Sequence, residues 1–232
     1  MGELIDMEGA RALVADRALW PRVRDFLWDF APQVHPSWLE GLPPSAVSLL
    51  PSSPRVRRAV LDVLGVEPCF HTFPKDDWSR LVLLDGKTLE SLAKWLGALA
   101  CADKLRGVTS GKAVRALKAA LPGVYPEVFG YTAYFKARAG TPDVEGREVG
   151  KSDVGSREPD VENIIAAGWS ILSASLSHLP ENLLRRFALK LPKSFQPPEG
   201  RLPTADSPAF DNKMIAKLLK LKFPEAYSLC CS

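Results

Sequence analysis

The sequence predicts an all-α fold, an irregular multi-helix domain with proline-rich connectors. Apolar residues recur at helical spacing in several segments, and no two strand-like runs are joined by a convincing hairpin turn. The chain also contains 20 prolines among its 232 residues, which break helices and keep them short. Only the run RLVLL at 80–84 has the composition of a strand, and it is too short to change this prediction.

The N-terminal part is expected to form short helices separated by proline-rich chain. Residues 8–28 have the apolar spacing of an amphipathic helix, but Pro21 interrupts it, so two short helices are as well supported as one. Residues 31–54 hold so many prolines that no long regular element fits there, and Trp38 is expected to pin this stretch to the core. A short helix over 55–65 follows, with its terminal glycine as the stop.

The middle of the chain has the strongest helical signal. Asp85 is predicted to cap a helix whose apolar residues follow at helical spacing from Leu89 to Ala100. Ser110 is predicted to start a second helix, which ends before Pro122. Because the link between them is short, the two helices are expected to pack as an antiparallel pair.

The segment 161–192 combines an apolar helix, a proline break and a short basic helix. It contains few reactive groups and a regular apolar pattern, which is typical of a segment built for packing and contact. Gly168 lies inside the first helix, where a glycine costs roughly 1 kcal/mol relative to alanine. We therefore predict that another helix crosses closely at Gly168. A last helix is expected over 211–223, with lysines around its apolar residues.

The domain organisation is predicted from one change in composition. Residues 139–160 are polar, charged and rich in glycine, and they cannot bury enough apolar surface to offset the entropy of ordering them. We interpret them as a flexible charged loop. It separates an N-terminal helical region, 1–138, from a C-terminal helical region, 161–232, which packs on the first to give one compact domain overall.

The histidines and cysteines do not form a recognisable reactive set. His35, His71 and His178 are isolated from one another, and no cysteine pair has the spacing of a zinc or redox motif. Cys69 and Cys101 are expected to be buried thiols, whereas the adjacent pair at 230–231 is expected in a loose tail. The sequence therefore predicts no catalytic residues, no metal and no cofactor, and a protein that is not an enzyme.

The net charge of +3 is small, but the C-terminal part is basic. Nine cationic side chains between Leu183 and Lys222 face only three acidic ones. This pattern fits a solvated helix face, a surface that binds an acidic protein, or a site for nucleic acid or anionic lipid. The candidate partner-binding residues are Arg185, Arg186, Lys190, Lys193, Lys217 and Lys220.

The N-terminus has no apolar core of the kind found in secretory signals, and no run of 18 uncharged apolar residues occurs. We therefore expect a soluble protein without direct membrane insertion.

Several apolar and proline positions of the C-terminal part form a pattern over about 160–225. It comprises Ile165-x-x-Gly168, a leucine-rich helix, Pro180, Arg186, Leu189-x-Leu191-Pro192, Lys217-Leu218-Leu219-Lys220 and Pro224, with an early Phe30-x-Pro32, Trp38 and Leu39. In these positions the chain resembles the YscK/SctK family. The segment 139–160 and the residues before Phe30 depart from the family's pattern.

The resemblance implies a non-enzymatic adaptor of the cytosolic sorting platform of a bacterial type III secretion injectisome. Its partners would be the inner-membrane ring protein (D component) and the pod protein (Q component), and indirectly the linker and the ATPase. The implied location is cytoplasmic, peripheral to the inner membrane through the secretion apparatus, with no nucleic acid bound.

Two alternatives remain open on the sequence alone. A helical nucleic-acid-binding protein would use the basic C-terminal helix, from Lys213 to Lys222. An unrecognised hydrolase would use Cys69 as its nucleophile, with His71 beside it.

Overall fold

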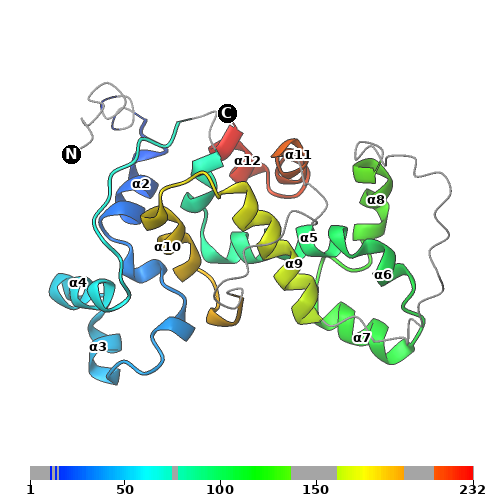
Figure 1. Ribbon diagram of the computed structural model, residues 1–232, viewed down its shortest axis with the longest axis horizontal. Coiled ribbons are helices and arrows are strands. Elements are labelled where there is room, and N and C mark those ends of the chain that lie inside the picture. The colour runs from blue at the N-terminus through cyan, green and yellow to red at the C-terminus, as the bar shows by residue number, and fades with distance from the viewer. Residues whose placement is uncertain are drawn as a thin grey trace. The chain divides into compact units, whose positions relative to one another are not determined.

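The computed structural model describes residues 11, 14, 16–74, 78–136, 161–195 and 212–231. Within these ranges every regular element is an α-helix or a 3₁₀ helix and there is no strand, so the predicted all-α class is confirmed (Figure 1). The predicted loop 139–160 lies outside the described residues. No helix in the described ranges is long and apolar enough to cross a membrane.

The chain divides into two compact units that do not follow the order of the sequence. Unit 1 consists of Met1–Glu90, Ser175–Gln196 and Ala216–Ser232, and unit 2 of Ser91–Ala174 and Pro197–Ile215. Segments from both ends of the chain therefore fold together in unit 1. The long middle segment forms most of unit 2.

Unit 1 begins with short helices that start at prolines. These are α2 (Trp20–Leu27), η1 (Ala31–Gln33), η2 (Pro36–Trp38), α3 (Pro44–Leu49) and α4 (Pro54–Val63), and each has a proline at its first or second position. Proline fits there because the first N–H groups of a helix have no partner within the helix. Pro21 is thus the second residue of the short helix α2, and the stretch 31–54 holds only short elements, as predicted.

The glycine stop of α4 is confirmed. Gly65 has a φ of +68°, and the Val66 N–H donates to the Leu61 carbonyl at 2.9 Å, which closes the helix end. At the other end, the Ser53 hydroxyl accepts a hydrogen bond from the Val56 N–H.

The segment 80–84 is not a strand. Its first four residues belong to the 3₁₀ helix η3 (Trp78–Leu83), in which the five residues from Ser79 to Leu83 are all buried, and Leu84 follows as a bend. A run of consecutive apolar residues fits a buried strand and a buried helix equally well, so periodicity could not separate the two. Helices α2, α10 (Glu181–Leu189) and α12 (Pro224–Cys231) all pack against η3.

The C-terminal cysteine pair is not in a loose tail either. It ends α12, in which Ala226 and Cys230, four residues apart, both turn inward. Burial raises the pKa of the Cys230 thiol to about 12. Cys69 and Cys101, predicted to be buried, are only half-buried.

The core of unit 1 centres on three phenylalanines. Phe26, Phe30 and Phe73 are fully buried, and the ring of Phe26 meets the other two edge to face at 5.5 Å and 6.1 Å. Figure 1 shows α10 beside α2 in this unit. The same rings contact the cationic groups of α10 described below.

Unit 2 contains most of α5 (Gly86–Ala100) and α9 (Val161–Ser175), with α6 (Ala102–Arg106), α7 (Gly111–Ala120) and α8 (Val128–Lys136). The predicted cap of α5 is confirmed, because the Asp85 carboxylate accepts hydrogen bonds from the Thr88 N–H and hydroxyl at 2.9 Å and 2.7 Å. Ser110 directly precedes α7, as predicted. In the sequence, the short helix α6 lies between α5 and α7, the two helices that were predicted to pack as an antiparallel pair.

The close crossing at Gly168 is confirmed, and it is reciprocal. A Cβ atom at Gly168 would lie 1.9 Å from the Ala93 carbonyl oxygen, and one at Gly97 would lie 1.9 Å from the Ile164 carbonyl oxygen. The backbones of α5 and α9 therefore touch at two glycines, one from each helix.

Candidate partner-binding surface

The six predicted partner-binding cations fall into two groups. Arg186 and Lys190 are each 2% exposed, so they cannot contact a partner and that part of the prediction is wrong. Arg185 and Lys217 are half-buried, and Lys193 and Lys220 are exposed. The sequence pattern missed this division because the apolar side of α10 extends over positions that carry long cationic side chains.

Lys190 is buried as part of the framework of unit 1. Its Nζ donates hydrogen bonds to the carbonyls of Val82 and Leu84, at 2.7 Å and 2.9 Å, and lies 4.7 Å from the centre of the Phe26 ring. Burial lowers the pKa of the Lys190 amine to about 7, while Asp85 raises that pKa and Arg22 lowers it. Lys190 thus joins the end of α10 to the end of η3.

Arg186 has a similar role one turn earlier on α10. Its two terminal nitrogens donate to the Phe26 and Glu67 carbonyls, both at 2.8 Å, and its guanidinium lies 5.5 Å from the centre of the Phe30 ring. Burial raises the pKa of the neighbouring Cys69 thiol, and Arg186 opposes that rise. A thiol with a raised pKa stays protonated at neutral pH, which does not favour the hydrolase alternative.

The buried cations of unit 1 share one pattern: each donates to at least one main-chain carbonyl near the end of a helix, while the Phe73 and Glu67 carbonyls lie in the non-helical chain between α4 and η3. Arg80, in η3, donates to the carbonyls of Phe73 and of Leu229, in the last turn of α12, at 2.9 Å and 3.2 Å. The Phe26 carbonyl likewise lies in the last turn of α2. The last carbonyls of a helix have no partner within it and carry partial negative charge, so a cation there satisfies them.

One candidate contact surface remains on α10 and η4 (Lys193–Phe195). The cationic groups of Arg185 and Lys193 lie 5.7 Å and 5.8 Å from the centre of the Trp38 ring. Arg185 is further held by two hydrogen bonds to the Leu64 carbonyl, at 3.1 Å and 3.2 Å. We call Trp38, Arg185 and Lys193 the basic–aromatic surface.

The backbone around this surface is held in place by long-range hydrogen bonds. The Trp38 indole N–H donates to the Leu191 carbonyl at 2.8 Å, and the Lys193 N–H donates to the Ser37 hydroxyl at 2.8 Å. These bonds hold the half-buried Trp38 ring against the chain that follows α10, a contact that the sequence did not indicate. A rigid aromatic ring beside two cations resembles the composition of interface hot spots.

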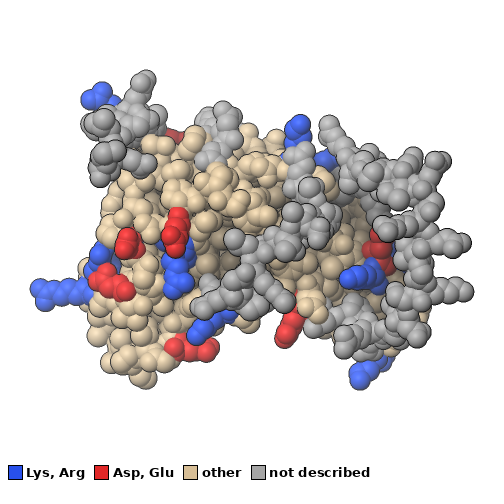
Figure 2. Space-filling view, in the orientation of Figure 1, with Lys and Arg blue, Asp and Glu red and all other residues tan. Residues whose placement is uncertain are grey.

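A second basic group lies on α11 (Asn212–Lys222) and α12. The Nζ of Lys220 lies 5.8 Å from the centre of the Tyr227 ring, and Leu221 beside it is exposed. Lys217 lies on the same helix and is half-buried. On the face drawn in Figure 2, the coloured basic and acidic side chains lie beside one another and form no large area of one sign.

A cavity in unit 1 has neither histidine nor cysteine in its lining. Its volume is about 270 Å³, below the roughly 300–1,000 Å³ of typical small-molecule sites. It is lined by Arg22, Leu84, Asp85, Thr88, Lys222, Phe223, Pro224, Glu225, Ala226 and Leu229. Asp85 caps α5; burial acts to raise the pKa of its carboxyl, but the hydrogen bonds from Thr88 and from nearby backbone N–H groups together lower that pKa. Across the described part of the chain, no three histidine, cysteine or acidic residues are grouped so as to hold a metal ion.

Comparisons of the chain with protein-family models, with curated proteins and with solved structures find no match. The resemblance to the YscK/SctK family thus depends on the residues quoted for it. Several of them are packing positions in the structure: Ile165, Gly168, Leu189 and Leu191 are buried. The family assignment stays a prediction.

Proposed function

We propose that this protein is a non-enzymatic adaptor of the cytosolic sorting platform of a type III secretion injectisome. It would link the inner-membrane ring protein (D component) to the pod protein (Q component). The basic–aromatic surface is the observation that carries the proposal, because it offers two cations on a fixed ring to an acidic partner. The resemblance to the YscK/SctK family supplies the identity of the assembly.

The proposal predicts which cations matter for capture of the pod protein. A variant carrying Arg185→Glu and Lys193→Glu should lose at least about tenfold in affinity, because both cations that face the partner are reversed. Binding would be measured with the purified pod protein on a sensor surface. Thermal unfolding of the variant checks that loss of the Arg185 bonds to Leu64 has not unfolded it.

A matched control comes from another exposed helix of the chain. Lys112 and Lys118 on α7 are exposed, and reversing both changes the net charge by the same amount. This control should bind the pod protein like the wild type. If both double variants bind equally well, the basic–aromatic surface is not the contact and the proposal loses its support.

A helical nucleic-acid-binding protein remains the second candidate, and the Lys220–Tyr227 contact is what favours it. Aromatic rings beside lysines can stack on bases while the cations contact phosphates. This function requires retention of a generic duplex or single strand in a gel-shift assay at low salt, with steep loss as salt rises. No retention at about 50 mM salt excludes it.

A further inference from the structure

Three aromatic side chains lie together at the surface of unit 1, apart from the basic–aromatic surface. Trp20 is the first residue of α2, Trp28 directly follows that helix, and Phe70 lies in the segment between α4 and η3. The ring centres of Trp20 and Trp28 are 5.7 Å apart, and those of Trp28 and Phe70 are 6.5 Å apart. Trp28 is 55% exposed and Phe70 is 40% exposed. We call these three residues the aromatic patch.

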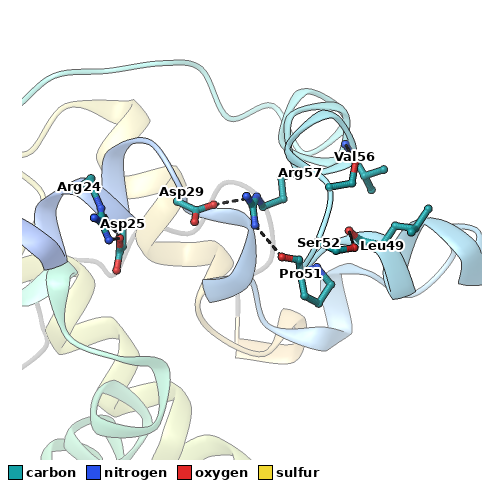
Figure 3. Close-up of polar contacts among 9 residues, drawn as sticks. Arg24, Asp25, Asp29, Leu49, Pro51, Ser52, Val56 and Arg57 are labelled. Atoms are coloured by element: carbon teal, nitrogen blue, oxygen red, sulfur yellow. Dashed lines mark hydrogen bonds and ion pairs between the residues drawn. The ribbon is translucent and has the colours of Figure 1, made fainter.

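The charges beside the patch are already neutralised within the chain. Arg24, between the two tryptophans on α2, pairs with Asp25 at 2.7 Å, and Asp29, which follows Trp28, pairs with Arg57 at 3.0 Å (Figure 3). Arg57 also donates to the Pro51 carbonyl at 3.0 Å. The two acidic residues that lie near Trp28 in the sequence, Asp25 and Asp29, are therefore paired, and the three rings themselves carry no charge, so the patch suits an apolar ligand better than an ionic one.

The size of the patch limits what can cover it. The two centre-to-centre distances place its outer rings at most about 12 Å apart, which is about two turns of an α-helix at 5.4 Å per turn. With about 150–250 Å² per aromatic side chain, the exposed fractions of Trp28 and Phe70 give roughly 200 Å² of apolar surface. A standard interface needs about 800 Å² from each partner, so the patch alone is too small for a stable symmetric dimer.

We propose that the aromatic patch docks the apolar stripe of a short amphipathic helix from a partner protein. That helix would present aliphatic side chains at positions i, i+3, i+4 and i+7, the spacing that faces a two-turn surface. This docking site rests on the proposed adaptor function, because another component of the assembly would supply the helix. Docking at this patch is insensitive to salt, whereas the basic–aromatic surface binds through charge.

The test uses a synthetic helical peptide with leucines at i, i+3, i+4 and i+7 and an uncharged polar face. A control peptide has the same composition, with its leucines spread around the helix. The full chain is labelled with 5-fluorotryptophan, and the fluorine signal of Trp28 is assigned by its loss in Trp28→Phe. The patterned peptide should shift this signal saturably, equally at about 50 mM and about 500 mM salt, and the control peptide should not.

Substitutions then assign the binding to the patch. Because replacing Trp28 removes its fluorine signal, the variants are compared by the fluorescence anisotropy of a dye-labelled form of the patterned peptide. Trp28→Ala and Phe70→Ala should each weaken peptide binding, by roughly 30-fold for the tryptophan, as expected for a hot-spot residue. Leu49→Ala is the matched control, since Leu49 is 47% exposed and lies outside the three-ring cluster. It should bind the peptide like the wild type. Thermal unfolding of all variants checks that they remain folded. A second variant, Trp28→Lys, tests the same position with a side chain that solvent accepts readily.

Four results would overturn the inference. The first is that the two peptides bind equally, and the second is that Trp28→Ala binds the patterned peptide as the wild type does. The third is that the chain forms concentration-dependent dimers that Trp28→Ala abolishes. The fourth is that the patch binds phosphatidylcholine vesicles in place of the peptide. The last two would assign the patch to a second copy of the chain or to a lipid surface. Because the peptide assay contains no secretion component, its failure is distinct from a failure of pod-protein capture.

Discussion

At the scale of single residues, the cations of the C-terminal segment show why charge counts alone mislead. The two terminal nitrogens of Arg186 and the Nζ of Lys190 donate hydrogen bonds to backbone carbonyls, and aromatic rings lie beside both cationic groups. Each supports a helix end that would otherwise be left with buried, unsatisfied acceptors. Their neighbour Arg185 makes one such contact and still lies at the surface over Trp38.

Removing Arg186 should be strongly destabilising. Arg186→Met keeps the side-chain bulk but leaves the Phe26 and Glu67 carbonyls without their donor, which should lower the free energy of unfolding by about 2–4 kcal/mol. The control is Arg24→Met, because Arg24 is exposed and its pair with Asp25 is a surface pair. Urea unfolding would measure both. Equal, small effects for the two variants would contradict a structural role for Arg186.

Lys190 should make stability depend on pH. Its pKa is about 7 in the folded protein and 10.5 without the fold, so between these values the unfolded chain binds a proton that the folded chain lacks. The free energy of unfolding should therefore rise with pH in this window, by at most about 1.4 kcal/mol per pH unit from this group. Below pH 7 both states are protonated and this contribution no longer changes.

The measurement compares urea unfolding of the wild type and Lys190→Met at pH 7.0, 7.5, 8.0 and 8.5, about 1.5 pH units in all. Only the difference between the two proteins is used, because the raised pKa of Cys230 acts in the opposite direction once free thiols ionise. The variant should have the smaller slope. Parallel slopes would show that Lys190 keeps its proton throughout this range.

At the scale of helices, two kinds of residue determine how the short elements are arranged: prolines and glycines. Prolines begin the helices of the N-terminal segment, and a glycine on each of α5 and α9 lets the two backbones touch. The effect of a proline on a helix start is local, so it can be predicted from the sequence. A close helix crossing needs a second helix from elsewhere in the chain, and the sequence indicated the crossing at Gly168 only.

A methyl group at either crossing glycine should disrupt unit 2. Gly97→Ala and Gly168→Ala each place a Cβ 1.9 Å from a carbonyl oxygen of the facing helix, and a backbone atom cannot move aside as a flexible side chain can. We expect each to lower the free energy of unfolding by about 3 kcal/mol or more. Gly130→Ala on α8 is the control, with nothing within 4 Å of its Cβ. It should be neutral or stabilise by up to about 1 kcal/mol. The comparison is made by thermal and urea unfolding, and similar stabilities for all three variants would contradict the close crossing.

At the scale of the whole molecule, the protein offers contact surfaces of two chemical kinds. The basic–aromatic surface presents charge on a fixed ring, and the aromatic patch presents apolar rings beside neutralised charges. An adaptor that must hold two neighbours benefits from contacts that respond differently to conditions. Both surfaces belong to unit 1.

The proposed function therefore predicts how binding responds to salt. Capture of the pod protein should weaken as salt is raised from about 50 mM to about 500 mM, because salt screens the electrostatic attraction between the cations Arg185 and Lys193 and an acidic partner. The variant with both cations reversed should have lost most of this salt dependence. Binding curves at several salt concentrations would measure it, and capture that is unaffected by salt would argue against a charged contact.

Local rules were enough to predict the all-α class, the cap at Asp85, the glycine stop at Gly65 and the absence of long elements over 31–54. Each depends on residues within one or two turns of one another, so the sequence alone determined them. The tertiary structure decided the rest. Whether a cation faces solvent or a carbonyl, and whether RLVLL is a strand or a buried 3₁₀ helix, depends on what distant segments pack against it. Arg186 and Phe26 are 160 residues apart in the sequence. The residues near Arg186 therefore do not indicate which distant segment will pack over it and bury its charge.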